Sequence, residues 1–315
     1  MSWHDSLIHL AGNEVFDGPF QNLWPLVAAP ALAAWISDRT ARLLPRTPAS
    51  AWPAAALTAA PGVVGLGAIV QALQEAPQWN KVLTWHGVMN FWVTPAIAAG
   101  LLLFALWRGW RRQAEVARLF ALSSPPGARL AGHAARLGLR ALQIPTREKE
   151  CFVAGLLRPT VFVSDGALDQ LGEAELEAAL SHERAHVTGR DTLFLMLLSF
   201  LRDLAPWGRG LALEAFRVAR EARADSRAAA AAGPLNLAAA LLALARPGAG
   251  PAAVLPMARN DSLRWRMQAL LDAAPAPAGS LGMRAGLLIG LAASGLLTFW
   301  PAAQVELMFL FCANT

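Results

Sequence analysis

The sequence predicts a mainly α-helical membrane protein, with four transmembrane helices and a cytosolic α+β domain between the third and the fourth. Two observations lead to this fold class. The chain has 315 residues, of which 55% are hydrophobic and only 16% are charged, and this is too apolar for an ordinary soluble enzyme. The apolar residues are also concentrated in blocks, which favours membrane spans beside one soluble domain.

The predicted spans are apolar segments that approach the length needed to cross a hydrocarbon core of about 30 Å. They cover residues 20–36, 51–73, 88–107 and 283–301. The first is short and is interrupted by Pro25 and Pro30. Because a helix bundle tolerates prolines inside a span, we expect a span there, with a surface helix as the alternative.

The distribution of arginine predicts the orientation of these spans. Residues 1–36 contain no Lys or Arg, whereas arginines follow the first and third predicted spans: Arg39, Arg42, Arg46, Arg108, Arg111 and Arg112. Because Lys and Arg accumulate on the cytoplasmic side, we expect an inner-membrane protein with both termini outside. Residues 1–107 would then hold three spans, 108–282 a cytosolic domain, and 283–315 the last span with a short external tail.

The charge and the cysteines exclude other classes. The formal net charge of +5 fits loop charges that orient spans, and no basic run interleaved with aromatic residues indicates nucleic-acid binding. Cys151 and Cys312 are the only two cysteines and lie far apart, so neither a disulfide framework nor a cysteine metal cluster is indicated. Residues 1–19 lack a basic start and contain acidic residues, which argues against a signal peptide.

Within the soluble region, the pattern predicts a helix over 130–142 and short strands at 151–154 and 160–163. The second strand is expected to offer an edge to an extended substrate. Residues 191–204 are apolar but too short for a span, so they dock the site against the spans, dip into the membrane interface or form a buried core helix. The Pro/Gly-rich stretches 245–260 and 273–281 predict connectors without catalytic groups.

The string ELEAALSHERAHVTGRD, residues 175–191, carries the chemistry. It predicts a helix that ends at Gly189 in a left-handed cap. His182 and His186 are four residues apart, so both imidazoles face the same side and can bind one metal ion. Glu183 lies beside them, where it can take a proton from a zinc-activated water that attacks a peptide carbonyl. A chance pairing on a surface helix is the alternative.

A catalytic zinc site with one open position needs a third protein ligand. The helix LALEAFRVAREARADSRAA offers Glu221 as the preferred ligand and Glu214 as the reserve. Asp225 is on the same face as Glu221 and is expected to hydrogen-bond a ligating imidazole. The alternative is an exposed helix whose arginines pair with these acids. Since the chain has no Tyr, another group must donate to the oxyanion, and His133 is one candidate.

At these residues the chain resembles the BlaR/MecR-type membrane metallopeptidases, a family of zincins. The resemblance rests on the order GLLRPTVFVSDGALDQL, GEAELEAALSHERAHVTGRD and EARAD, and it covers most of 108–290. It implies zinc ligands at His182, His186 and Glu221 with one Zn²⁺ per chain, Glu183 as general base, and cleavage of a cytosolic repressor-like protein or of the chain itself. About a dozen residues follow the last predicted span, so we expect no penicillin-binding sensor domain, and a separate sensor protein is the expected source of a signal.

Two alternatives stay open. The HtpX-type quality-control peptidases share the histidine motif and the EARAD-like segment, but they place the catalytic domain between the second and third spans. A non-catalytic signal transducer, in which zinc only stabilises the fold, is the alternative from outside the enzymes. The expected partners are a protein or peptide substrate and the lipid bilayer, and no nucleic acid.

Overall fold

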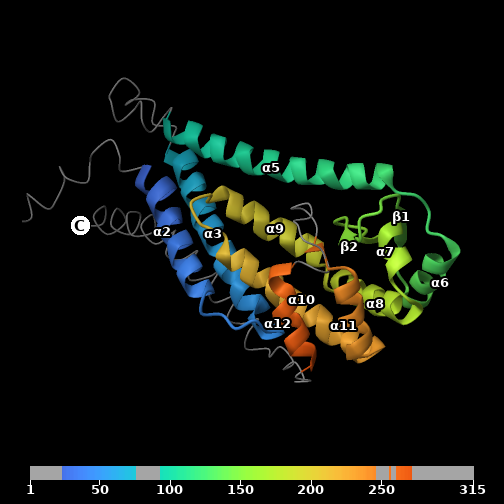
Figure 1. Cartoon of the computed structure of the whole chain (residues 1–315). Helices are drawn as coiled ribbons and strands as arrows, with labels where there is room; N and C mark the ends of the chain where they lie inside the picture. Colours follow the sequence, from blue (N-terminus) through green and yellow to red (C-terminus); the bar gives the residue numbers. More distant parts are fainter. Residues whose placement is uncertain (1–22, 76–92, 246–254, 257–259, 272–315) are drawn as a thin grey trace, which may run out of the picture.

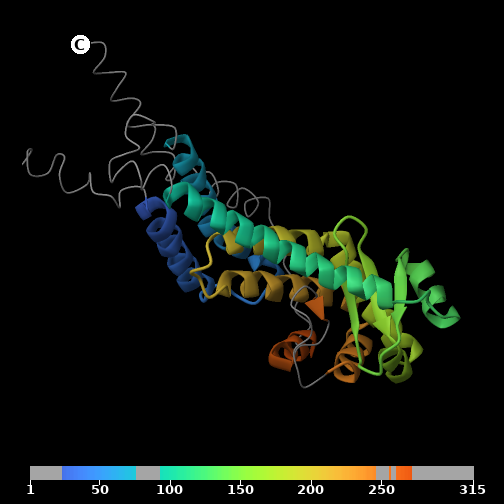
Figure 2. The ribbon, with the colours of Figure 1, turned by 90° about the horizontal axis from the view of Figure 1, so that it is seen from above.

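The computed structural model describes residues 23–75, 93–245, 255–256 and 260–271. Three long helices extend together to one side of the molecule, and a small sheet lies at the other (Figure 1, Figure 2). The three are α2 (Leu23–Ala41), α3 (Ala51–Glu75) and α5 (Thr94–Leu122), with a short 3-10 helix, η1 (Pro48–Ser50), before α3. The remaining helices surround the sheet or connect it to this bundle: α6 (Ala128–Leu137), α7 (Asp165–Gln170), α8 (Glu173–Gly189), α9 (Asp191–Leu204), α10 (Leu211–Ala232), α11 (Pro234–Ala243) and α12 (Asn260–Leu271).

One helix in the described part of the chain, Pro48–Val70, is long and apolar enough to cross a membrane. It corresponds to the second predicted span. The expectation of four spans is therefore not confirmed. The fourth predicted span, 283–301, and the first residues of the third lie outside the described residues. The rest of the third belongs to α5, which continues without a break through Arg108 and Arg112 to Leu122, so this apolar stretch is only the first part of a longer, mixed helix.

The sheet has four strands in the order β1-β3-β2-β4. They are β1 (Ala141–Ile144), β2 (Cys151–Ala154), β3 (Thr160–Ser164) and β4 (Leu255–Pro256). β3 pairs in parallel with β1 and antiparallel with β2, and β2 pairs antiparallel with β4. Both sequence-predicted strands are confirmed as β2 and β3, but β3 is an inner strand, so the expectation that it offers a free edge is wrong. Every residue of β2 and β3 is buried, in keeping with their continuous apolar runs.

The helix expected over 130–142 is shorter than predicted. α6 ends at Leu137, because Gly138 adopts the left-handed conformation (φ 64°) and caps the helix. The chain then turns into β1, which pairs with β3 from Ala141↔Val161 onward. The apolar residues after Leu137 thus belong to a strand, and a short apolar run does not distinguish the two structures by its pattern alone.

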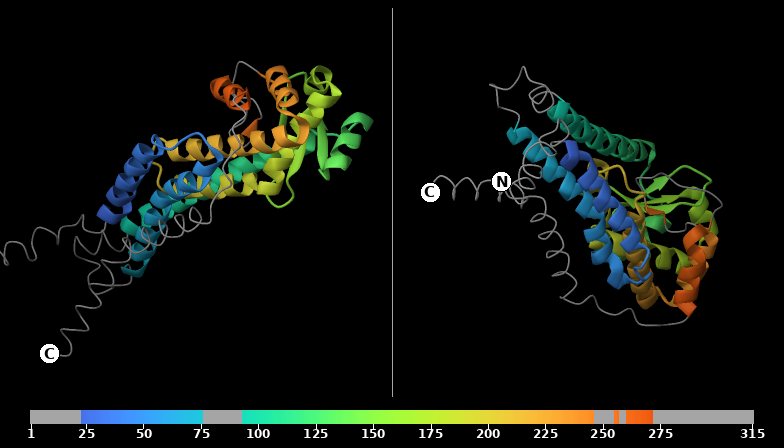
Figure 3. Two further views of the ribbon diagram at one scale, coloured as in Figure 1. Left: turned by 90° about the horizontal axis from the view of Figure 1, so that it is seen from below. Right: turned by 90° about the vertical axis from the view of Figure 1, so that its left-hand side faces the viewer.

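Helix α9 connects the region around the sheet to the helical bundle. Its residues pack against α3 and α5, with Phe200, Leu201 and Leu204 among the apolar contacts. Gly62 of α3 lies so close to the backbone of Leu201 that any Cβ there would collide with it. α3 also packs against α10. Figure 3 shows the same arrangement from two further sides. Residues 191–204 therefore form a helix that packs against α3, the helix that corresponds to the second predicted span.

Candidate metal centre

Helix α8 carries the histidine motif and is stabilised at both ends. At its start, the backbone N–H of Gly172 donates to Glu175 Oε2 at 2.8 Å, and Glu173 and Glu175 place negative charge in the first turn, as a helix N-terminus prefers. At its end, the left-handed residue is Arg190 (φ 50°) and not Gly189, so the predicted glycine cap is wrong by one residue. Gly189 lies under the guanidinium groups of Arg220 and Arg223, which a Cβ at this position would displace.

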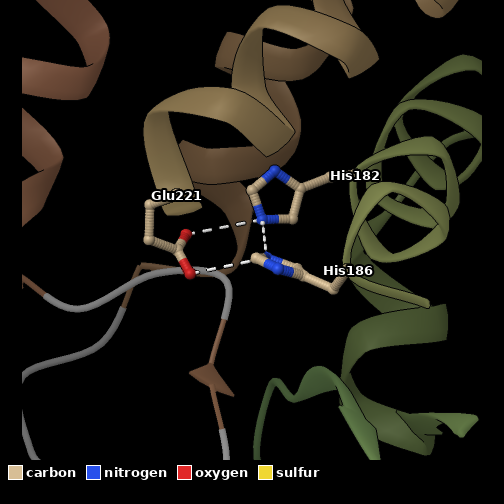
Figure 4. A group of neighbouring side chains, drawn as sticks. All are labelled: His182, His186 and Glu221. Atoms are coloured by element: carbon tan, nitrogen blue, oxygen red, sulfur yellow. Dashed lines mark hydrogen bonds and ion pairs between the residues drawn. The ribbon is translucent and has the colours of Figure 1, made fainter. Parts of the chain in front are cut away.

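The structure brings His182, His186 and Glu221 together (Figure 4). One ligand atom from each lies within 4.8 Å of the others. The two imidazole Nε2 atoms are 3.1 Å apart, and Glu221 places Oε2 3.4 Å from His182 Nε2 and Oε1 3.5 Å from His186 Nε2. The imidazoles come from successive turns of α8 and the carboxylate from α10, and all three residues are buried.

A carboxylate faces the other ring nitrogen of each histidine. His182 Nδ1 lies 3.0 Å from Asp225 Oδ1, an ion-pair contact that does not meet hydrogen-bond geometry. His186 Nδ1 lies 2.7 Å from Asp191 Oδ2. A carboxylate at Nδ1 holds the proton there and leaves Nε2 free to bind a metal ion. The sequence analysis did not identify Asp191 as a partner of His186. Its position directly after the end of the helix, five residues beyond His186, could have indicated this role.

Arginines hold these carboxylates in place. Asp191 is fully buried and contacts Arg220 and Arg223 of α10. Arg266 of α12 is also buried, donates through Nε to Asp225 Oδ2 at 2.7 Å, and places Nη1 3.0 Å from Glu221 Oε2. Sequence reasoning missed Arg266, because nothing in the pattern of α12 distinguishes a buried arginine from the exposed arginines around it.

The electrostatics of the site follow from burial and from these contacts. Burial alone would lower the pKa of His182, but Asp225 and Glu221 outweigh it, so the pKa lies above its usual value. Burial would raise the pKa of Glu221, but the Arg266 guanidinium and the imidazoles hold it well below its usual range. The pKa of Asp225 is likewise lowered by Arg266 and His182 against the effect of burial. The site is thus built around ionised carboxylates.

Glu183 differs from the other acids of the site. Its side chain is fully buried, and neither carboxylate oxygen has a hydrogen-bond partner in the described part of the protein. Burial raises its pKa above the usual value for a glutamate. A buried carboxylate without a partner is costly to keep, and such groups usually mark a functional role or a bound water or ion.

Two candidates from the sequence are not brought to the site. Glu214 is half-exposed and pairs with Arg217 at 2.5 Å on the surface of α10. His133 is buried between α6 and the start of α8, where its Nε2 lies 2.7 Å from Glu173 Oε2 and its Nδ1 lies 2.7 Å from Arg136 Nη2. Both ring nitrogens of His133 are therefore engaged at the opposite end of α8 from His186.

The residues present fit a zinc ion. Two imidazole nitrogens and one carboxylate oxygen are a usual donor set for a zinc site that keeps an open position. The carboxylates behind both imidazoles supply the orientation that such ligands require. The unpartnered carboxylate of Glu183 lies on the same helix, next to the first histidine. Zinc is thus the cofactor that this geometry suits.

One family model matches part of the chain. Residues 130–264 match the model of Peptidase family M48. The matched segment is less than half of the chain, and it contains all three candidate ligands together with Glu183, Asp191 and Asp225. Arg266 lies two residues beyond its end. The M48 match supports an HtpX-like zinc metallopeptidase segment, whereas the BlaR/MecR-type resemblance and the lack of a sensor domain are not confirmed.

Two curated relatives of this chain carry the name "Protease HtpX homolog 2". The protein from Methanosarcina mazei is 46% identical over 48 residues, which are 15% of this chain and 16% of the relative. The protein from Methanosarcina acetivorans is 39% identical over 64 residues, which are 20% of this chain and 22% of the relative. The aligned segments thus span less than a quarter of either relative. No solved structure matches the chain significantly.

Proposed function

We propose that this chain is an integral-membrane, zinc-dependent endopeptidase. One observation carries the proposal: His182, His186 and Glu221 converge within 4.8 Å beside the buried, unpartnered Glu183. This combination offers three metal ligands and one group that is free to accept a proton. The match of this segment to Peptidase family M48 supports the same activity.

In the proposed hydrolysis, different residues of the chain would bind the metal, orient its ligands and transfer the proton. His182, His186 and Glu221 would hold the ion, and Asp225 and Asp191 would keep both imidazoles in the tautomer that presents Nε2. When bound, zinc supplies Lewis acidity, which lowers the pKa of a bound water to about 7 and polarises a carbonyl. Glu183 would accept the proton of the attacking water and return it to the leaving amine. Burial of the site excludes bulk water and strengthens these interactions.

The proposed location is the inner membrane. Four spans at 20–36, 51–73, 88–107 and 283–301 would place both termini outside and residues 108–282 in the cytosol. The apolar helix Pro48–Val70 supports the second of these spans. The arginines after the first and third segments support the orientation. Because Gly62 and Gly65, in the middle of the second proposed span, lie against Leu201 and Leu204 of α9, α9 would lie beside that span at the depth of the membrane. The catalytic site would then lie close to the inner membrane surface.

For the substrate, two classes remain in the proposal. The similarity to two proteins named "Protease HtpX homolog 2" favours an HtpX-like quality-control peptidase that cleaves membrane proteins. The alternative is regulated cleavage of one cytosolic protein or of the chain itself. The purified protein in liposomes, offered an unfolded membrane protein and a folded cytosolic protein in parallel, separates these classes. Broad cleavage of the first substrate supports the HtpX-like function.

The activity itself is tested by removing and restoring the metal. The full-length protein in detergent should cleave an unfolded protein substrate, lose this activity on treatment with a chelator, and regain it when zinc is added back. A chain that cleaves equally well after the metal has been removed would overturn the proposal. Bound zinc without cleavage of any substrate would favour the non-catalytic transducer.

A further inference from the structure

Helix α10, which carries Glu221, begins without a capping side chain of its own. Its N-cap residue is Gly210, which adopts a left-handed conformation (φ 77°) and has no side chain that could accept a hydrogen bond. The first backbone N–H groups of a helix have no partner within the helix. In most helices a Ser, Thr, Asp or Asn at the N-cap fills this need. In α10 another part of the chain must do so.

Asp38 of α2 supplies this cap from far away in the sequence. Its Oδ1 accepts a hydrogen bond from the N–H of Leu211 at 2.8 Å, and its Oδ2 accepts one from the N–H of Arg209 at 2.5 Å. The side chain is largely buried in this contact. The two segments lie so close that a Cβ on Gly208 would be only 3.2 Å from Ala34 Cβ. A negative charge at this end also suits the helix dipole.

The cap joins a predicted membrane helix to a proposed metal ligand. Asp38 follows the end of the first predicted span at residue 36 by two positions. Glu221 lies ten residues beyond Leu211 in the same unbroken helix, which is about 15 Å at 1.5 Å per residue. A helix moves largely as a rigid rod, so a shift of its first turn along the axis reaches Glu221. The two imidazoles come from another helix, α8, which Arg220 and Arg223 of α10 contact through the carbonyl groups of Gly189 and Ala185.

We propose that Asp38 is a positioning residue for Glu221, so that the affinity of the site for zinc depends on the contact between α2 and α10. The inference rests on the proposed zinc site. This gives α2 a role beyond anchoring the chain. A displacement of the end of α2 that carries Asp38 would change the position of the Glu221 carboxylate relative to His182 and His186. The spans would in this way influence the site without contacting the substrate.

The test measures zinc affinity in the full-length chain in detergent, by competition with a chelator of known affinity. Asp38→Ala removes both acceptors and should weaken zinc binding about tenfold, the lower end of the range for residues that orient metal ligands. Asp38→Asn keeps one acceptor oxygen for the two N–H donors and should give a smaller loss. The visible spectrum of bound Co²⁺ reports the geometry of the ligands. It should differ from the wild-type spectrum more in Asp38→Ala than in Asp38→Asn.

Ile144→Val is the matched control, because it removes one methyl group from the core cluster beside β1 and lowers stability without touching α10. Its zinc affinity should equal that of the wild type. The inference is overturned if Asp38→Ala binds zinc as tightly as the wild type, or if Ile144→Val weakens binding as much. If Asp38→Ala does not fold, an unchanged affinity in Asp38→Asn overturns it. Wild-type protein that binds no zinc overturns the proposed function as well, whereas the other outcomes leave that function standing.

Discussion

Arg266 and Asp225 form a buried ion pair, with Arg266 Nε and Asp225 Oδ2 separated by 2.7 Å. The same guanidinium reaches Glu221, and Asp225 in turn contacts His182. One cation from α12 thus neutralises two carboxylates of α10 that surround the proposed metal. Removing one partner of such a pair leaves an uncompensated buried charge, which costs more than the pair itself contributes.

We therefore expect Arg266→Met to lower the free energy of unfolding by about 3 kcal/mol. The loss should be larger in chelator-treated protein than in zinc-loaded protein, because zinc supplies positive charge to the same carboxylates. Arg266→Lys should restore little, since an ammonium group does not reproduce the bidentate contact. Denaturant unfolding with and without zinc checks this, and an equal loss in both conditions would argue against a shared site.

Asp191 orients His186, so Asp191→Asn should weaken zinc binding. The substitution removes the charge that stabilises the Nδ1 proton and leaves Arg220 and Arg223 without their anion. The expected loss of zinc affinity is about 10- to 100-fold. Glu173→Gln is the matched control, because Glu173, which is on the same helix as His186, forms a carboxylate–imidazole pair with His133 of α6. Equal zinc affinities for the two variants would contradict the orienting role.

Gly189 and Arg190 should respond to substitution in opposite directions. Gly189→Ala places a Cβ against the guanidinium groups of Arg220 and Arg223 and should destabilise the protein by about 1–3 kcal/mol. Arg190→Gly removes the energetic cost of a left-handed backbone at a residue with a side chain, which is about 1–2 kcal/mol. The greater conformational freedom of glycine in the unfolded chain partly offsets this gain in stability. The substitution should be neutral or slightly stabilising. If Gly189 were the left-handed cap, Arg190→Gly would instead destabilise.

Cys151 should resist thiol reagents in the folded protein. It lies in β2 with 2% of its surface exposed, and burial raises its pKa well above the usual value, with the nearby Glu183 adding to the shift. Because only the thiolate reacts, raising the pH from about 7 to about 9 should leave labelling slow, whereas an ordinary thiol would react faster. Alkylation of a Cys312→Ser variant, native and unfolded, measures this. Rapid labelling of the native protein would contradict the packing of β2.

The local chemistry of the site could be predicted from the sequence because it depends on helical spacing. His182 and His186 share a face of any α-helix, and so do Glu221 and Asp225, so their geometry follows once both helices are assumed. β2 and β3 also have clear apolar runs bounded by a turn. These features need no knowledge of how distant segments pack.

What could not be predicted depends on contacts between distant segments. Arg266 reaches the site from another helix, and Asp38 caps a helix that begins 173 positions later, and neither has a local signature. β3 is an inner strand because β1 pairs with one of its edges and β2 with the other. The residue pattern of a single strand does not show which neighbours it will have. The left-handed residue after α8 is Arg190 and not Gly189, a difference of one residue at a helix end, where sequence patterns are least precise.

The most direct test of the central claim compares the wild type with Glu183→Gln for both bound zinc and protein cleavage in liposomes, with His186→Ala as the variant that should lose zinc. The wild type should hold about one zinc per chain and cleave an unfolded protein substrate. Glu183→Gln should keep the zinc and lose cleavage by at least about 100-fold, because it removes the proton acceptor and no ligand. Wild-type protein without zinc, or a Glu183→Gln variant that cleaves like the wild type, would contradict the account.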